Sequence, residues 1–389
     1  MTTIENIINK QTNEIDKESR INISREIFKF LSTKNNIFIT NREFFTWNGD
    51  IHNANWLSSP LDIYAENIRE FTNELCDHLY LQKFKYVRSR LDFFPNITTV
   101  EVEFEIVCRV IKSNKYIESN GTYEKLYNVK INTNPFLILP YLYFEYITPK
   151  FSFESWKDNI QLEKNIWESI SITENFNINK NFTKDPELKN LQKNILRKLE
   201  DRNDYLMTGE YSLFTMLNID ESDIYYPINI LCVNIEELID IIRQEVSDKN
   251  ITIRSKEVEF YFWEKEFEIF VGDKPFINIM TLDYGFNFVK MNYLNHTNFH
   301  GILLYLIIKK LQSDDKNSDK YFMALIKLLI EGKSKSNELE ISKFQILTDK
   351  IIGPIESPFL KYKIKEWNRE LDYAYRPDKK NEQCENATS

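Results

Sequence analysis

A basic cluster formed by Lys83, Lys85, Arg88 and Arg90 is the most prominent group of residues that could contact phosphate. Clustered lysine and arginine side chains bind the phosphates of nucleic acids, so these four residues are the candidate RNA-binding site. The alternative is that they form the solvated end of a helix, where basic side chains are common. The net charge of −9 argues against broad wrapping of nucleic acid, although a local basic groove is compatible with it.

Acidic residues that could take part in chemistry occur at two further positions. In residues 98–111, Glu101, Glu103 and Glu105 alternate with apolar residues, which predicts a half-buried strand with an acidic face. A solvated strand face is the ordinary explanation for such a pattern. Asp62 is a single acid in a short apolar strand at residues 60–64, and an exposed aspartate at a strand edge is the alternative to a functional one.

Zinc binding and disulfide formation have little support in the sequence. His296 and His300 are four residues apart and could share a helix face, but no third ligand accompanies them. The cysteines are scattered without a CxxC pair, and we expect the three internal ones to be reduced and packed, namely Cys76, Cys108 and Cys232.

Short strands and amphipathic helices must position these residues. Apolar spacing of three and four predicts helices, which we expect at residues 21–31, 68–81, 188–200, 235–246, 300–311 and 320–329. Besides the two strands above, β-branched and aromatic runs predict strands at residues 227–233, 258–263, 266–271 and 276–280. Residues 172–187 are rich in Asn, Lys and Thr and are the best candidate linker.

A strand-helix segment that begins at Pro60 recurs at Pro227 and keeps its residue character without gaps. Each copy follows a glycine turn, at Gly49 and Gly209, and each precedes a Phe-Glu-Ile sequence, at residues 104–106 and 267–269. Ordinary units of the same kind can look alike by chance. Because the order of the three features agrees and their offsets are close, we favour an internal duplication.

The glycine turn, the acid-bearing strand that enters a helix, and a later acidic strand together resemble the nucleotidyltransferase-fold signature. The order of segments along residues 35–335 is similar to that of the poly(A) polymerases of large cytoplasmic DNA viruses. That family pairs a catalytic domain with a second, inactive one. The resemblance implies a link to mRNA 3′-end formation in a virus or virus-like element.

The resemblance also implies roles for individual residues. Gly49 would bind nucleotide, and Asp62 with Glu103 would be catalytic and would hold Mg²⁺ or Mn²⁺ against the triphosphate. The first copy departs from the pattern, because Pro60 replaces one acid and Asp50 would repel phosphate. The second copy has Pro227 and Asn229 at both acid positions, so we expect it to be inactive.

The predicted fold class is α+β, with two nucleotidyltransferase-like mixed-sheet domains joined by a helical segment. We expect an N-terminal helical extension, a degenerate first domain, a helical middle segment with linker, an inactive second domain and a C-terminal extension. Their predicted bounds are 1–34, 35–133, 134–200, 201–335 and 336–389.

Three functions are compatible with this sequence. The favoured one is a degenerate, non-catalytic poly(A) polymerase-like protein that binds RNA or a partner subunit. The others are an active template-independent adenylyltransferase that uses ATP with Mg²⁺ or Mn²⁺, and a structural protein that shares only the fold.

The N-terminal residues are polar and the apolar stretch at residues 301–308 is too short to span a bilayer, so we expect no membrane association. If the protein is viral, the expected location is the host cytoplasm or the virion.

Overall fold

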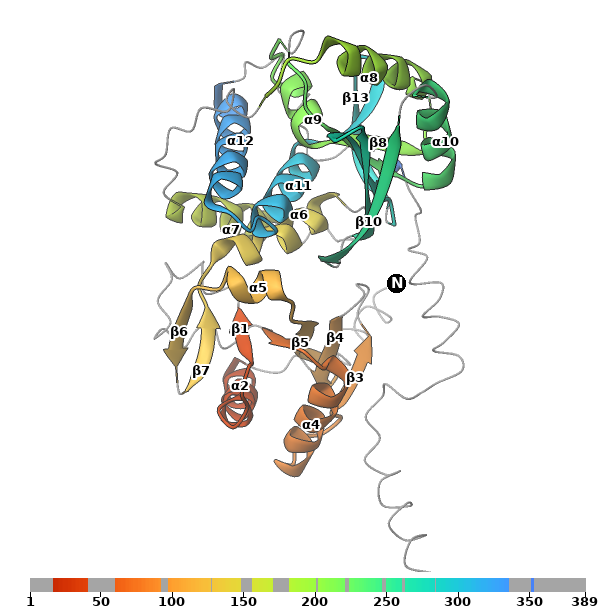
Figure 1. The fold of residues 1–389 in the computed structure, drawn as a ribbon. Coiled ribbons are helices and arrows are strands. Elements are labelled where there is room, and N and C mark those ends of the chain that lie inside the picture. The colour runs from red at the N-terminus through yellow and green to blue at the C-terminus, as the bar shows by residue number, and fades with distance from the viewer. Residues whose placement is uncertain are drawn as a thin grey trace, which may run out of the picture. The chain divides into compact units, whose positions relative to one another are not determined.

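The computed structural model describes residues 17–40, 60–91, 97–126, 128–147, 156–170, 182–200, 202–220, 224–246, 250–260, 263–283, 285–335 and 351–352. The chain divides into two compact units (Figure 1). The first contains the described residues up to Pro135 together with residues 164–167, and the second contains the other described residues. The fold class is therefore α+β, as predicted.

The first unit is a mixed sheet with helices packed on it. Its elements in chain order are α2 (Lys17–Leu31), β1 (Phe38–Thr40), β2 (Leu61–Ala65), α4 (Ile68–Leu81), β3 (Arg88–Leu91), β4 (Ile97–Val102), β5 (Glu105–Lys112), α5 (Lys115–Ser119), β6 (Tyr123–Leu126) and β7 (Val129–Asn132). A 3₁₀ turn, η2 (Pro135–Leu137), crosses the boundary to the second unit.

The second unit combines a larger sheet with more helices. Its elements are α6 (Leu139–Ile147), α7 (Trp156–Ser169), α8 (Pro186–Leu199), β8 (Tyr205–Thr208), α9 (Gly209–Met216), β9 (Ile228–Cys232), α10 (Ile235–Glu245), β10 (Ile251–Phe260), β11 (Trp263–Val271), β12 (Lys274–Thr281), β13 (Phe286–Met291), β14 (Leu294–Thr297), α11 (Phe299–Leu311), α12 (Lys316–Lys335) and β15 (Ile351–Ile352). Residues 164–167 of α7 are grouped with the first unit. Within the predicted middle segment, α6 and α8 are grouped with the second unit.

The two sheets have the same strand order, which supports the duplication. The first runs β3-β4-β5-β2-β1-β7-β6, and the second runs β10-β11-β12-β9-β8-β14-β13 with β15 added at the end. Every corresponding pair also has the same direction: the pairs β2 with β5 and β9 with β12 are parallel, as are β1 with β7 and β8 with β14. The Pro60 and Pro227 junctions therefore lead into equivalent strands, β2 and β9.

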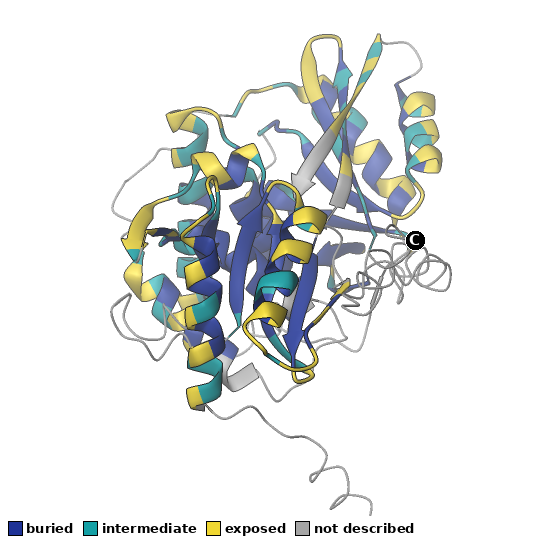
Figure 2. Ribbon diagram, turned by 90° about the horizontal axis from the view of Figure 1, so that it is seen from below, coloured by how far each residue is buried: buried dark blue, intermediate teal, exposed yellow. Residues whose placement is uncertain are grey.

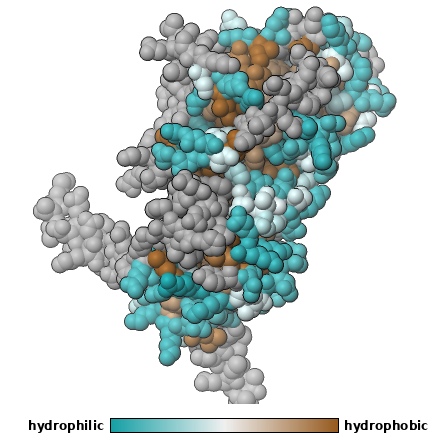
Figure 3. Space-filling view, turned by 90° about the vertical axis from the view of Figure 1, so that its left-hand side faces the viewer, coloured by the Kyte–Doolittle hydropathy of each residue, from teal (hydrophilic) through white to brown (hydrophobic). Residues whose placement is uncertain are grey.

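The central strands form the core of each unit. All described side chains of β2, β4 and β9 are buried, and α4 packs Phe71, Leu75 and Leu79 toward its sheet. Figure 2 shows this arrangement as dark-blue strands under helices whose outer faces are yellow. Among the residues coloured in Figure 3, most are hydrophilic and the apolar ones form separate patches. No helix in the described part of the chain is long and apolar enough to cross a membrane.

Equivalent asparagines begin the helix that follows the Pro-led strand in each copy. The side chain of Asn67 accepts a hydrogen bond from the Glu70 amide and donates to the Glu70 carboxylate at 2.8 Å. Asn234 makes the same two contacts with Glu237, the second at 3.1 Å. The Asn side-chain oxygen satisfies a backbone amide that has no partner within the helix, and the contact with the Glu carboxylate holds the Asn side chain in place. This cap also fixes where α4 and α10 begin, as the sequence predicted.

Removing either cap tests its contribution. Asn67→Ala and Asn234→Ala are each expected to lower the free energy of unfolding by about 1 kcal/mol, because a helix amide loses its acceptor. Asp at either position keeps an acceptor and should retain most of the stability. Urea unfolding of the four variants measures the effect, and an alanine variant as stable as the wild type would contradict the role of the cap.

Two details of the predicted elements are wrong. Residues 98–111 form two strands, β4 and β5, joined by a two-residue turn at Glu103 and Phe104. The alternation of side chains continues across this turn, and neither residue is a usual turn former, so the turn was not visible in the sequence. As a result, the two Phe-Glu-Ile sequences are not equivalent: residues 104–106 enter β5, whereas residues 267–269 lie in β11, the counterpart of β4.

Candidate functional site

Asp62 lies in the middle of the first sheet, on β2, and is bound by an arginine from the neighbouring strand. Parallel pairing of β2 with β5 sets Asp62 opposite Arg109. The guanidinium donates from Nε to Oδ1 at 2.6 Å and from an Nη atom to Oδ2 at 3.1 Å. Both side chains are largely buried, with 11% and 15% of their surface exposed. A bidentate pair of this kind uses both oxygens of the carboxylate.

This arrangement does not fit a pair of Mg²⁺ ions. A two-metal site needs several carboxylates, and in the resembling fold the third acid comes from a strand next to the one that carries the first two. On the strand next to β2, the residue opposite Asp62 is Arg109, whose charge cancels that of Asp62 and would repel a cation. Among the described residues, no three His, Cys, Asp or Glu side chains gather where they could hold a metal ion.

Glu103, the predicted second metal ligand, is not brought to Asp62. It is exposed in the turn between β4 and β5, whereas the strand register aligns Asp62 with Arg109 and Thr99. Glu103 is four positions after Thr99, which at 3.3 Å per residue corresponds to about 13 Å along the strand direction.

The neighbouring glutamates do not form a solvated strand face, so that part of the sequence interpretation is wrong. Glu101 is only 1% exposed, and it accepts from the guanidinium groups of Arg88 and Arg90 at 2.5 and 2.6 Å. Glu105 pairs with Arg20 of α2. These glutamates therefore neutralise arginines of the first unit rather than present free carboxylates.

The predicted basic cluster runs from the C-terminal end of α4, where the Lys83 amide donates to the Tyr80 carbonyl, to β3, an end strand of the described sheet. Lys83 and Lys85 are exposed in the segment between α4 and β3, while Arg88 and Arg90 lie on the exposed face of β3. Because Arg88 and Arg90 share one buried carboxylate, the net charge of the four basic residues with this carboxylate remains positive. Gly49, the predicted nucleotide-binding residue, is outside the described residues.

The second copy has a different polar pair at the equivalent position. Parallel pairing of β9 with β12 sets Asn229 opposite Asn278, whose Nδ2 donates to Asn229 Oδ1 at 2.9 Å. Asn229 in turn donates to Glu210 at 2.8 Å. Thus each copy has a hydrogen-bonded pair of polar side chains at the same position of its sheet. The pair is Asp62 with Arg109 in the first copy and Asn229 with Asn278 in the second.

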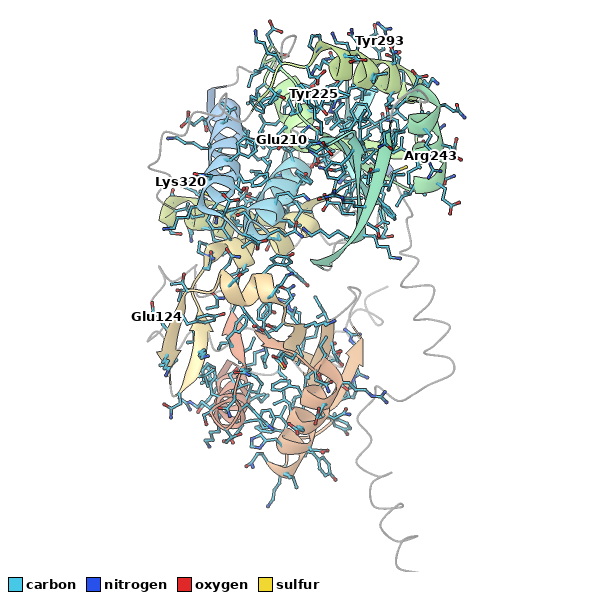
Figure 4. The ribbon with its side chains drawn as sticks, viewed as in Figure 1. Glu124, Glu210, Tyr225, Arg243, Tyr293 and Lys320 are labelled. Atoms are coloured by element: carbon cyan, nitrogen blue, oxygen red, sulfur yellow. The ribbon has the colours of Figure 1, made fainter. Side chains whose placement is uncertain are left out.

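Gly209 and Glu210 close this polar network at the start of α9. Gly209 has φ +66°, and a Cβ there would lie 2.7 Å from the Asn229 side chain and 2.8 Å from Tyr305, so only glycine fits. Glu210 is buried inside the second unit (Figure 4) and also accepts from the Tyr321 hydroxyl at 3.2 Å. Burial raises the pKa of this carboxyl. A buried carboxyl just after the glycine leaves the turn unsuited to an anionic ligand.

His296 and His300 are buried core residues, and the described residues supply no third metal ligand for them. His296 Nδ1 lies 2.9 Å from the Ser212 hydroxyl, and burial lowers the pKa of His296 to about 3. At neutral pH the ring is therefore uncharged, as suits its packing.

Sequence reasoning missed Arg109, Asn278 and Tyr321, which complete the two polar networks. One signal for Arg109 existed, since it is the single charged residue in the apolar run from Ile106 to Ile111. A charge in the interior of a buried strand normally has a partner. Asn278 and Tyr321 gave no comparable signal.

Comparison with known proteins supports the fold that the sequence resemblance implied. No protein-family model and no curated protein sequence matches the chain. Among solved structures, it is similar to the Megavirus polyadenylate synthase, with a TM-score of 0.71 and 14% identity over 100% of this chain and 88% of that chain. The chain has a poly(A) polymerase-like fold. Its two sheets are accordingly nucleotidyltransferase-like.

Proposed function

We propose that this chain is a non-catalytic poly(A) polymerase-like protein that acts in viral mRNA 3′-end formation by binding RNA or a partner subunit. The observation that carries the proposal is the Asp62–Arg109 ion pair. An arginine holds the one acid that remains at the position where the resembling fold binds its metal ions. The likeness to a Megavirus polyadenylate synthase supports the viral setting, with the host cytoplasm or the virion as the place of action.

The chemistry of nucleotidyl transfer explains why this pair matters. Phosphoryl transfer depends almost entirely on metal ions and on positioning, since the protein itself does little covalent chemistry. A cation at Asp62 would have to displace Arg109 from a largely buried contact. The second copy offers two amides at the same position, and amides carry no charge with which to attract Mg²⁺. Among the described residues, neither copy therefore offers the set of carboxylates on which this reaction depends.

A primer-extension assay tests the proposal. The purified full chain, an RNA primer, ATP and either Mg²⁺ or Mn²⁺ are expected to give no lengthened product, because the metal-binding carboxylates are missing. The Megavirus polyadenylate synthase serves as the comparison enzyme in the same buffer. The readout is denaturing gel electrophoresis of a labelled primer.

Two variants make the negative result informative. Asp62→Asn keeps the size of the side chain and Asp62→Ala removes it, and circular dichroism checks that both are folded. Primer extension by the wild type that disappears in both folded variants would overturn the proposal in favour of an adenylyltransferase that uses Asp62.

A further inference from the structure

Two aromatic side chains form an exposed stacked pair at one end of the first sheet. Tyr86 and Phe104 are 66% and 63% exposed, and their rings lie 5.1 Å apart at 29°. A backbone hydrogen bond from Glu103 to the Lys85 carbonyl, 3.2 Å long, ties the two segments together. Aromatic rings with this much exposure contribute little to a core. Their arrangement therefore needs an explanation other than packing.

The backbone at these aromatics is held in a conformation that such residues disfavour. Tyr86 has φ 51° and Phe104 has φ 71°, both in the left-handed region, and Glu103 beside Phe104 has φ 52°. Two-residue hairpin turns that need positive φ favour Asn and Gly. Bulky residues in this region are rare and cluster at functional sites.

The second copy supplies an internal comparison for this turn. Val102 pairs with Glu105 across the turn in the first copy, and Val271 pairs with Lys274 across the equivalent turn between β11 and β12. The residues of that second turn are Gly272, with φ 60°, and Asp273. Both are ordinary turn formers. The two turns therefore differ: the residue at the position of Phe104 is Asp273, which lacks a positive φ, so the left-handed phenylalanine is specific to the first copy.

Positive charge surrounds the aromatic pair. The Arg88 guanidinium lies 5.3 Å from the centre of the Phe104 ring, and Lys83 and Lys85 are exposed on the same segment as Tyr86. Arg88 and Arg90 share the Glu101 carboxylate. Among the described residues of these two segments, four cations stand against the carboxylates of Glu101 and Glu103, while Glu105 is paired with Arg20 of α2, although the whole chain carries −9. This local charge favours a polyanion over an apolar or basic partner.

We propose that Tyr86 and Phe104 form a stacking platform for bases of single-stranded RNA, with Lys83 and Lys85 contacting the adjacent phosphates. The platform gives a location to the RNA binding in the proposed function, on which it rests. Aromatic faces stack on any base, so the site should tolerate different sequences, and the basic side chains should make binding sensitive to salt. A double helix hides its base faces and should bind less well.

The decisive variant is Phe104→Gly. Because glycine suits φ 71° and the ring is exposed, the melting temperature should stay the same or rise. Loss of the ring should weaken binding of a fluorescein-labelled oligouridylate by roughly 5- to 150-fold. Tyr86→Gly should act in the same direction. Lys83→Gln with Lys85→Gln should instead reduce the slope of log affinity against log salt by about 1.4, since single strands contribute about 0.7 for each phosphate contact.

Tyr293→Gly is the matched control. Tyr293 is also an exposed aromatic at positive φ, 74% exposed with φ 67°, but it belongs to the turn between β13 and β14 in the second unit (Figure 4). The same ring deletion there should leave RNA affinity unchanged. Titrations with oligoadenylate, oligodeoxythymidylate and duplex RNA compare the classes of ligand.

The proposal fails if the wild type does not bind single-stranded oligonucleotides, or if Phe104→Gly and Tyr86→Gly bind as tightly as Tyr293→Gly. It also fails if duplex RNA competes as well as single strands do. These outcomes are separate from the primer-extension result: a chain that binds RNA through the platform and also extends a primer overturns the non-catalytic function and leaves the platform in place.

Discussion

Arg109→Ala is expected to lower the free energy of unfolding of the first unit by about 3–5 kcal/mol. The substitution leaves the Asp62 carboxylate largely buried without its bidentate partner, and an unpaired buried charge is among the most destabilising changes in a protein. Urea unfolding followed by tryptophan fluorescence measures the loss. The equivalent change in the second copy, Asn278→Ala, removes a neutral donor and should cost only about 1–3 kcal/mol.

A double-mutant cycle separates the ion pair from the packing of its two side chains. Asp62→Ala together with Arg109→Ala should be more stable than the sum of the single effects implies, because neither charge is then left alone. Additive effects of the two substitutions on the free energy of unfolding would show that the two side chains are not coupled. That result would contradict the inference that Arg109 binds the Asp62 carboxylate.

The second large effect is a gain of metal binding when the missing acids are supplied. In the double variant Pro60→Asp with Arg109→Asp, side chains 60 and 62 are two apart and lie on one strand face, and position 109 is opposite Asp62. Three carboxylates then replace a neutral pair. One unit charge 4 Å from another contributes about 4 kcal/mol at an effective dielectric constant of 20, so even a fraction of this should raise Mn²⁺ affinity at least about 100-fold.

Isothermal titration calorimetry measures the Mn²⁺ affinity, and a rise in melting temperature with added Mn²⁺ provides a second readout, since an ion that binds only the folded state stabilises it. The uncharged double variant Pro60→Asn with Arg109→Asn is the control and should not respond. If the wild type already binds Mn²⁺ as tightly as the acidic variant, Arg109 does not exclude metal and the proposed loss of activity is wrong.

Local patterns made the repeated junctions predictable. The apolar strand after Pro60, its counterpart after Pro227 and the helix after each were all found where expected, because a short apolar run and helical spacing are properties of neighbouring residues. That Pro60 and Asn229 stand at acid positions followed from the resemblance to the nucleotidyltransferase signature, because it supplies the expected pattern.

The partners of the polar side chains at the candidate site could not be predicted, because they depend on contacts between residues far apart in the sequence. Asp62 and Arg109 are 47 residues apart and meet only because β2 and β5 pair in parallel in one register. A shift of one residue would have faced Arg109 the other way. The turn at Glu103 and Phe104 contains no Gly or Asn, so the two strands it joins looked like one.

The open edge of the first sheet has a consequence for how copies of the protein coexist in solution. Among the described strands, β3 ends its sheet, and the free backbone of an end strand can pair with a strand of another molecule. Arg88 and Arg90 share the single carboxylate of Glu101, so one net positive charge remains along this strand and disfavours the approach of the same strand of a second molecule. The excess of arginine on β3 therefore also discourages pairing of this strand between two molecules.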